Sequence, residues 1–155
     1  METQPSIIKR ILMCTDFSPN AGYAFEFAVD AAVRRENAQL YLLHVIPEPD
    51  AQFWRTYIYD SDFNVDEKAK ADLDDKIDRE YRPKVPVSVP FEVAFRIGKD
   101  YQKILEYADE ISADMIVVGR QGMNPLKKIF FGSVAEKIAT RAKCPVIVVP
   151  KFMGK

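Results

Sequence analysis

Five short apolar segments alternate with longer amphipathic segments along this chain. The apolar segments lie at residues 7–13, 40–46, 91–97, 115–118 and 146–149. The run at 40–46 is almost continuously apolar, which is typical of a strand buried on both faces of a parallel sheet, because half-exposed strands alternate between apolar and polar positions. We therefore predict five β-strands at these positions.

Helical periodicity fills the connections between the predicted strands. After the first strand, Ser18 fits the N-cap of a helix and Pro19 fits its first helical position. This helix should turn one broad face to the sheet, made of Ala24, Phe27, Ala28, Ala31 and Ala32.

Three further helices are predicted. Asn64 and Glu67 have the spacing of a capping box, and apolar residues then recur at every fourth position as far as Tyr81. This apolar stripe is narrow, which predicts a helix on the surface. Residues 101–111 and 134–143 carry the other two helical patterns.

The element order β-α-β-α-β-α-β-α-β defines the expected fold class. Crossover connections of this kind place helices on both faces of a parallel sheet. We expect an α/β protein with a doubly wound five-stranded parallel sheet. Its length of 155 residues fits one domain, and no repeat or linker interrupts residues 1–155.

The connection at residues 47–63 is unusual because it is rich in aromatic residues. One interpretation is a lid or a surface for a partner. The other, which we favour, is that the rings pack over the edge of the sheet, since loops of this length usually anchor themselves with their own side chains. The aromatic residues are Phe53, Trp54, Tyr57, Tyr59 and Phe63.

A glycine motif of the form G-x2-G-x9-G-S lies between the fourth predicted strand and the last predicted helix. It consists of Gly119, Gly122, Gly132 and Ser133. Glycines let backbone amides approach an anion closely, and a helix that begins at the last glycine directs its unpaired amides to the same place. The motif therefore predicts a phosphate cradle.

Asp16 follows the first strand as Gly119 follows the fourth. If those strands are neighbours, the carboxylate and the glycine loop face one crevice at the carboxyl edge of the sheet. A carboxylate repels a triphosphate unless a divalent cation lies between them, so Asp16 suggests Mg²⁺ or Mn²⁺. Two structural alternatives stay open, since Asp16 also fits a turn and Ser133 with Glu136 fits a capping box.

Composition narrows the class of function. Lys and Arg number 22 against 23 Asp and Glu, so no net field favours a nucleic acid. No apolar run approaches the roughly 18 residues that cross a bilayer, and the start lacks a signal-peptide layout, so we expect a soluble cytoplasmic protein.

Cys14 and Cys144 lack metal-ligand spacing. His44 lies in an apolar strand without a nucleophile motif, which favours a structural role for this histidine.

The same residues carry a family resemblance. The glycine motif, Val134–Lys137 and residues 144–150 resemble the ATP-binding branch of the universal stress protein family. Residues 16–18, 44–45 and 113–118 are similar to that family too, so the resemblance covers nearly the whole chain.

The resemblance implies the strand order 3-2-1-4-5, with ATP bound at the carboxyl ends of the first and fourth strands. It also implies a homodimer formed through the last strand, Val146–Val149. In that strand order, Cys14 and Cys144 are too far apart to form a disulfide, so we expect reduced thiols.

It further implies which residues contact the nucleotide. Asp16 would lie near ribose and phosphates, and Val45 against adenine. Thr15 and Arg120 are also expected to bind the nucleotide, and the particular role of Arg120 stays open. The remaining implied contacts come from the glycine motif and the helix after it, with Gly119 and Gly122 beside ribose and phosphate, and Gly132, Ser133 and Val134 along the phosphate chain.

Our leading hypothesis is a nucleotide-dependent regulator or binding module of the stress response that binds ATP, or ADP or AMP. An alternative is a slow ATPase or autophosphorylating enzyme, although the chain lacks a Walker-type lysine and a clear base to orient water. A second alternative is a nucleotide-free dimeric scaffold. The sequence does not identify a protein partner.

Overall fold

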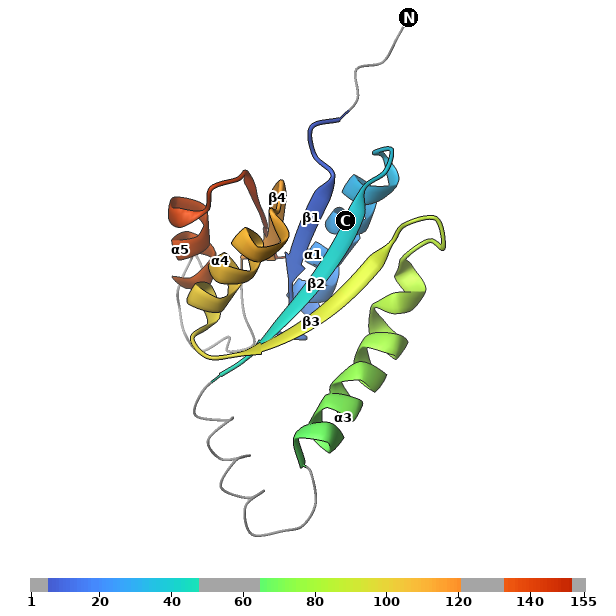
Figure 1. Cartoon of the computed structure of the whole chain (residues 1–155), viewed down its shortest axis with the longest axis vertical. Helices are drawn as coiled ribbons and strands as arrows, with labels where there is room; N and C mark the ends of the chain where they lie inside the picture. Colours follow the sequence, from blue (N-terminus) through green and yellow to red (C-terminus); the bar gives the residue numbers. More distant parts are fainter. Residues whose placement is uncertain (1–5, 48–64, 121–132, 152–155) are drawn as a thin grey trace, which may run out of the picture.

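The computed structural model describes residues 6–47, 65–120 and 133–151. Five parallel strands form one sheet in the order β3-β2-β1-β4-β5, which confirms the predicted fold class and strand order (Figure 1). The strands are β1 (Arg10–Cys14), β2 (Gln39–Ile46), β3 (Phe91–Ile97), β4 (Met115–Gly119) and β5 (Val146–Val149).

The first strand begins later than its apolar residues suggested. Ile7 is 88% exposed, and β1 starts at Arg10. The amides of Lys9 and Arg10 both donate to Oδ2 of Asp114, at 2.9 and 2.8 Å, just before β4 begins. A side chain therefore takes the place of a strand neighbour at this end of the sheet.

Four α-helices in the described ranges cover the two faces of the sheet. On one face, α1 and α3 pack over the strands, and on the other face α4 and α5 do so (Figure 1). A 3-10 turn, η1 (Arg82–Lys84), follows α3. The helices are α1 (Pro19–Val33), α3 (Val65–Glu80), α4 (Asp100–Ile111) and α5 (Ser133–Arg141).

The start of α1 confirms the predicted cap. Oγ of Ser18 accepts a hydrogen bond from the amide of Ala21 at 3.1 Å, and Pro19 is the first residue of the helix. This cap fixes where the chain turns from the end of β1 into α1, because it satisfies an amide that has no partner within the helix. It therefore also fixes the loop between them.

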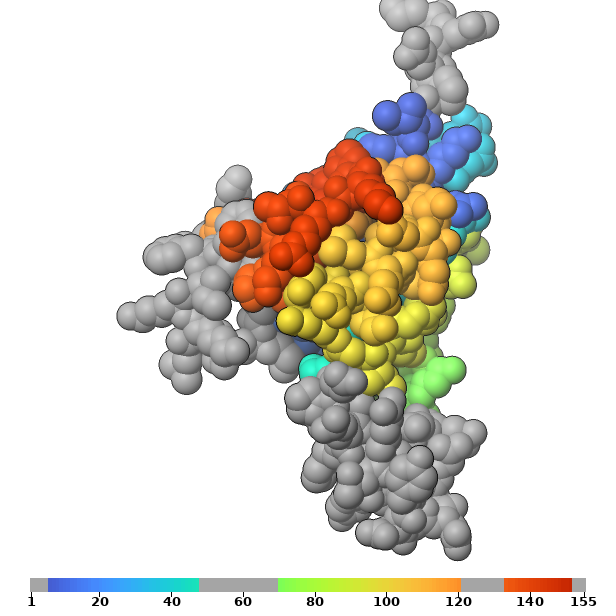
Figure 2. Space-filling view, turned by 60° about the vertical axis from the view of Figure 1, so that its left-hand side comes forward, coloured from blue at the N-terminus to red at the C-terminus, as the bar shows by residue number. Residues whose placement is uncertain are grey.

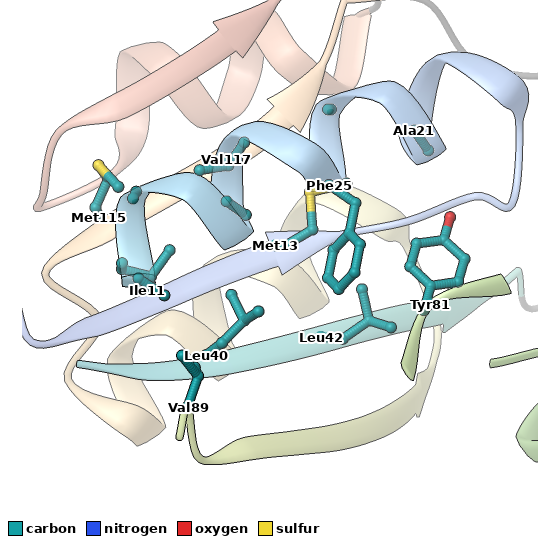
Figure 3. Close-up of a cluster of buried hydrophobic side chains, with 14 of the residues drawn as sticks. Ile11, Met13, Ala21, Phe25, Leu40, Leu42, Tyr81, Val89, Met115 and Val117 are labelled. Carbon is teal, nitrogen blue, oxygen red and sulfur yellow. The ribbon is translucent and has the colours of Figure 1, made fainter. Parts of the chain in front are cut away.

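The covered face of α1 differs from the predicted one at Phe27. Phe25 is fully buried, whereas Phe27 is 44% exposed. Phe25 shares the helical face of Ala21, Ala24 and Ala28, and Phe27 lies about 200° from Phe25 around the helix. Phe25 reaches the core between β1 and β2, close to Tyr81 (Figure 3).

The predicted surface helix α3 is anchored at its end. Its side chains at positions 70, 71, 72, 74 and 75 are exposed, but Ile77 is 1% and the following Tyr81 is 2% exposed. The ring of Tyr81 packs against that of Phe25 with centroids 4.8 Å apart. In Figure 3 the hydroxyl of Tyr81 points away from this core.

Candidate functional site

The site expected from the sequence lies at the edge of the sheet where β1 and β4 end side by side. The register pairs Leu12 with Ile116 and Met13 with Val117, so Cys14 and Gly119 finish at the same edge of the sheet. The connections after these two strands go to opposite faces, because α1 lies on one face and α5 on the other. Such a switch point is where open α/β sheets bind ligands.

The sequence-predicted site residues reach this edge from several elements. Thr15 and Asp16 follow β1, Val45 is near the end of β2, and Gly119 ends β4. Val45 and Val134, near the start of α5, pack against the same hydrophobic cluster between the sheet and the α4/α5 layer. The site residues Gly122 and Gly132 lie outside the described residues, as does the aromatic connection at 48–63.

Asp16 forms the turn that the sequence left open as an alternative. Its Oδ1 accepts a hydrogen bond from the amide of Ser18 at 2.9 Å. Only one carboxylate oxygen is used in this way, so the turn and a second role for Asp16 are compatible. The other structural alternative was a capping box formed by Ser133 and Glu136. The structure differs slightly from it, because Ser133 is the first residue of α5 and not the residue before the helix.

Thr15 is held by hydrogen bonds on every side. Its amide donates to the carbonyl of Leu43 at 3.0 Å, and its carbonyl lies 2.8 Å from Nδ1 of His44, which donates to it. Its hydroxyl accepts from the amide of Phe17 at 2.9 Å and is 2.5 Å from the hydroxyl of Tyr81. Thr15 is 6% exposed, so these bonds satisfy polar groups that have lost contact with water.

Phe17 adopts a backbone conformation that is rare for a bulky residue. Its φ is +63°, in the left-handed region. Its ring lies 4.6 Å from the ring of His44 and 5.8 Å from that of Tyr81, and the ammonium of Lys76 is 4.9 Å from its centroid. These contacts hold the strained residue in place, and strain of this kind is typical of loops that position a ligand.

The surroundings of His44 favour its neutral form. Burial lowers its pKa below 6.5, and the nearby Lys76 acts in the same direction, whereas the bond to Thr15 and the charge of Asp16 raise it. A neutral imidazole with its proton on Nδ1 donates to the Thr15 carbonyl. These contacts give His44 a positioning role at the end of β1.

Sequence reasoning missed Tyr81 and Asn20 as residues that shape the site. Tyr81 entered only as the last member of the α3 stripe, although a phenol at the end of a buried stripe needs a polar partner, and that need was a usable signal. Asn20 gave no comparable signal. Its contact with Gly119 exists only because α1 crosses the end of β4.

Gly119 is placed where a side chain would not fit. A Cβ at this position would lie 2.7 Å from Nδ2 of Asn20, which is itself 9% exposed. The next residue, Arg120, donates its amide to the carbonyl of Val149 at 2.8 Å, and its Nε is buried without a hydrogen bond. The start of the glycine loop is therefore fixed by α1 on one side and β5 on the other.

Metal ligands are sparse in the described part of the chain. Residues 6–47, 65–120 and 133–151 contain no group of three or more His, Cys, Asp or Glu side chains that could hold an ion. Cys14 and Cys144 are free thiols, and burial raises the pKa of both. Neither cysteine therefore has the thiolate character that metal binding requires.

A groove of about 580 Å³ lies on the α1 side of the same loop. The charged residues among the described lining are Glu26, Glu80 and Lys84, so both signs of charge are present. The other described lining residues are Phe17, Ser18, Pro19, Gly22, Tyr23 and Tyr81.

The sheet order and the opposite connections after β1 and β4 define a doubly wound α/β protein with a candidate ligand site at its switch point. The chain belongs to the universal stress protein family, whose sequence profile matches residues 8–150. No helix among the described residues is both long and apolar enough to span a bilayer.

Known relatives agree with this assignment. A Staphylococcus aureus (strain USA300) protein assigned to the universal stress proteins is 34% identical over 154 residues, which cover 91% of this chain and 83% of that protein. The universal stress protein UspA from Lactobacillus plantarum superposes with a TM-score of 0.72 at 25% identity, over 93% of this chain and 99% of that one. A universal stress protein in complex with cAMP superposes with a TM-score of 0.64 at 26% identity, over 93% and 98% of the two chains.

Proposed function

We propose that this protein binds an adenine nucleotide at the carboxyl ends of β1 and β4 and acts as a nucleotide-dependent regulator. The observation that carries the proposal is the juxtaposition of the Asp16 turn with the start of the glycine motif at Gly119. The related universal stress protein that contains cAMP supports the adenine base as part of the ligand. ATP is the nucleotide that the motif suggests, with ADP and AMP as weaker alternatives.

The described residues divide into supports and contacts. Thr15, His44 and Tyr81 support the loop, so that Asp16 meets ribose and phosphates in one fixed position. Val45 would lie against adenine, and Ser133 at the start of α5 would face the phosphates, where helix amides and the helix dipole favour an anion. Gly122, Gly132 and Val134 complete the proposed contacts, and Arg120 contributes a positive charge beside them.

Asp16 is the residue that would hold a divalent cation in this proposal. The second oxygen of its carboxylate suits Mg²⁺ or Mn²⁺, which prefer oxygen ligands, and the ion would offset the repulsion between the carboxylate and the phosphates. The described residues contain no group of three or more His, Cys, Asp or Glu side chains that could hold the ion without the nucleotide. A regulator of this kind also needs a partner that binds the loaded form better than the empty form.

The proposal extends to the cellular compartment and the oligomeric state. The two free cysteines fit a reducing compartment such as the cytoplasm. The short edge strand β5 would pair with its copy in a second subunit and hide its unpaired backbone groups.

Calorimetric titration with ATP and Mg²⁺ tests the nucleotide site, and two glycines provide a matched pair of variants. In Gly119→Ala the new methyl group would displace Asn20, and we expect affinity to fall at least about tenfold. In Gly22→Ala the new methyl group meets no atom within 4 Å, so binding should equal that of the wild type. Absence of saturable binding by the wild type, after checking that no nucleotide copurified, would overturn the proposal.

A further inference from the structure

The ring of Tyr101 is surrounded by three cationic side chains. Nζ of Lys99, Nζ of Lys137 and Cζ of Arg141 lie 5.2, 4.6 and 5.1 Å from its centroid. Any two of these charges are therefore separated by at most about 10 Å, which is no more than the Debye length at 0.1 M salt. We call these four residues the Tyr101 cluster.

Internal pairing does not account for the Tyr101 cluster. None of its three cations takes part in the ion pairs of the described residues, whereas the nearby Lys103 pairs with Glu106 at 3.0 Å. Lys137 and Arg141 are four residues apart on α5, a spacing at which like charges destabilise a helix slightly. Cation–π contacts offset this only partly, because exposed ones are weak.

The surroundings of the Tyr101 phenol indicate an excess of positive charge. Its pKa is lowered, first by a hydrogen bond from Arg141, then by one from Gln102, and also by the charges of Lys99 and Arg141. Asp100 is the first residue of α4, and its Oδ1 accepts a hydrogen bond from the amide of Tyr101 at 2.7 Å. An anion at this surface would relieve the repulsion.

The Tyr101 cluster begins beside the candidate nucleotide site. Ser133, Lys137 and Arg141 are spaced four residues apart, so they lie roughly along one face of α5, over about 12 Å. Tyr101 is in the first turn of α4, which starts at the same carboxyl edge of the sheet. Figure 2 shows α4 in yellow and α5 in orange-red packed side by side, and Tyr101 and Val134 pack against one hydrophobic cluster beneath them.

We propose that the Tyr101 cluster binds the terminal phosphates of a polyphosphorylated adenine nucleotide, one with a phosphate chain longer than that of ATP. This inference rests on the proposed nucleotide site, which would hold the nucleoside and the first phosphates near Ser133. The additional phosphates then continue along the face of α5 toward Lys137, Arg141 and Lys99. The row of cations leading away from Ser133 favours an extended phosphate chain over a compact anion.

The test compares adenosine 5′-tetraphosphate with ATP and AMP by calorimetric titration. The Lys137→Ala/Arg141→Ala variant should bind the tetraphosphate roughly tenfold more weakly than the wild type and bind ATP and AMP nearly as well as the wild type does. Lys143→Ala is the control for the loss of a positive charge elsewhere on the surface, because Lys143 is exposed and pairs with Asp109 at the far end of the helix layer. It should leave all three affinities unchanged.

Four outcomes would overturn the inference. Equal losses for ATP and the tetraphosphate would show that no phosphate beyond those of ATP reaches the cluster, and an equal effect of Lys143→Ala would show only a general effect of charge. If the binding of a polyglutamate peptide depends on Lys137 and Arg141 while the binding of the tetraphosphate does not, the surface would be assigned to an acidic protein segment. An unchanged tetraphosphate affinity in the double variant would show that the Tyr101 cluster does not bind the phosphate chain.

Failure of the proposed function can be distinguished from failure of this inference. If no adenine nucleotide binds, titration with inorganic tripolyphosphate tests whether the Tyr101 cluster binds a phosphate chain. Tripolyphosphate binding that is lost in the double variant would mean that the Tyr101 cluster binds a phosphate chain although the protein binds no adenine nucleotide. Absence of tripolyphosphate binding as well would overturn both proposals.

Discussion

Thr15 connects three separate parts of the fold at one residue. Its backbone binds Leu43 and His44 of β2, and its hydroxyl binds Tyr81 after α3 and the amide of Phe17. Because Asp16 is the next residue, its position depends on these bonds. Tyr81 and His44 therefore hold Thr15 in position without contacting the proposed nucleotide themselves.

Tyr81→Phe should lower both stability and nucleotide affinity. It removes the hydrogen bond to Thr15 but keeps the ring contacts, so we expect a loss of about 1 kcal/mol in the free energy of unfolding. Nucleotide affinity should fall a few-fold because the loop is less fixed. Tyr41→Phe, which removes the 2.7 Å bond to Gln39, is the control that should lower stability without changing affinity. Equal affinities in both variants would contradict the role given to Tyr81.

The pH dependence of Tyr81 follows from its environment. Burial raises its pKa from 10.0 to about 12. The neutral phenol therefore stabilises the fold fully below pH 10, and this contribution is lost as the pH rises toward 12. Chemical unfolding across this range should show a smaller alkaline loss in Tyr81→Phe than in the wild type.

His44 should make stability depend on pH in the opposite direction. Because its folded-state pKa lies below the unfolded value of 6.5, the neutral ring contributes fully above pH 6.5. As the pH falls below that value, the unfolded chain binds a proton that the folded chain resists, and stability decreases. His44→Asn keeps a donor near Nδ1 and should lose less stability between about pH 7.5 and about pH 5. An identical decrease in both proteins, measured by urea unfolding, would exclude His44 as the cause.

At the scale of elements, α1 determines both the core and the edge of the site. Its cap at Ser18 fixes the loop after β1, its inner face fills the core, and Asn20 borders Gly119. The two phenylalanines of this helix separate these roles, because one is buried and the other is largely exposed.

Phe25→Ala and Phe27→Ala therefore form a matched pair. Phe25 is 0% exposed and packs against Tyr81 and Phe91, so its truncation should cost about 3–5 kcal/mol in the free energy of unfolding. Phe27 is 44% exposed and should cost less than about 1 kcal/mol. Denaturant unfolding measures both values. Similar losses in the two variants would mean that α1 is rotated from its described position.

At the scale of the whole molecule, β5 is one of the two edge strands of the sheet, and it is the one that the family resemblance implies as the dimer interface. It is the last strand in the order, and Ile147 is 40% exposed on it. Exposed apolar edges are where sheets of separate subunits join. This edge is the basis for the proposed homodimer.

Ile147→Lys should convert the proposed dimer into a monomer while leaving the fold intact. A charge on this face opposes burial against a second copy. Light scattering after size exclusion measures the mass, and circular dichroism checks the fold. Val87→Lys, at a fully exposed position, is the control and should remain dimeric. A monomeric wild type would contradict the assembly itself, and a dimeric Ile147→Lys would move the interface elsewhere.

The sequence by itself determined the elements and their class. Strands buried on both faces, the Ser18 cap and the Gly119 motif are local signals, because they depend on hydrophobic periodicity and backbone chemistry within a few residues. The strand order came from the family resemblance and agrees with the structure. Periodicity was less reliable where two faces of a helix both carried aromatic rings, as Phe27 illustrates.

Only the tertiary structure decided which distant side chains meet. The bonds of Thr15 to Tyr81 and His44 span 66 and 29 residues, and the cations around Tyr101 come from α5 and from the residue before α4. Such contacts depend on how the layers pack on the sheet and on the angle of each helix, which no local pattern encodes. The sequence therefore predicted where a ligand site should lie, whereas packing decided which residues support it.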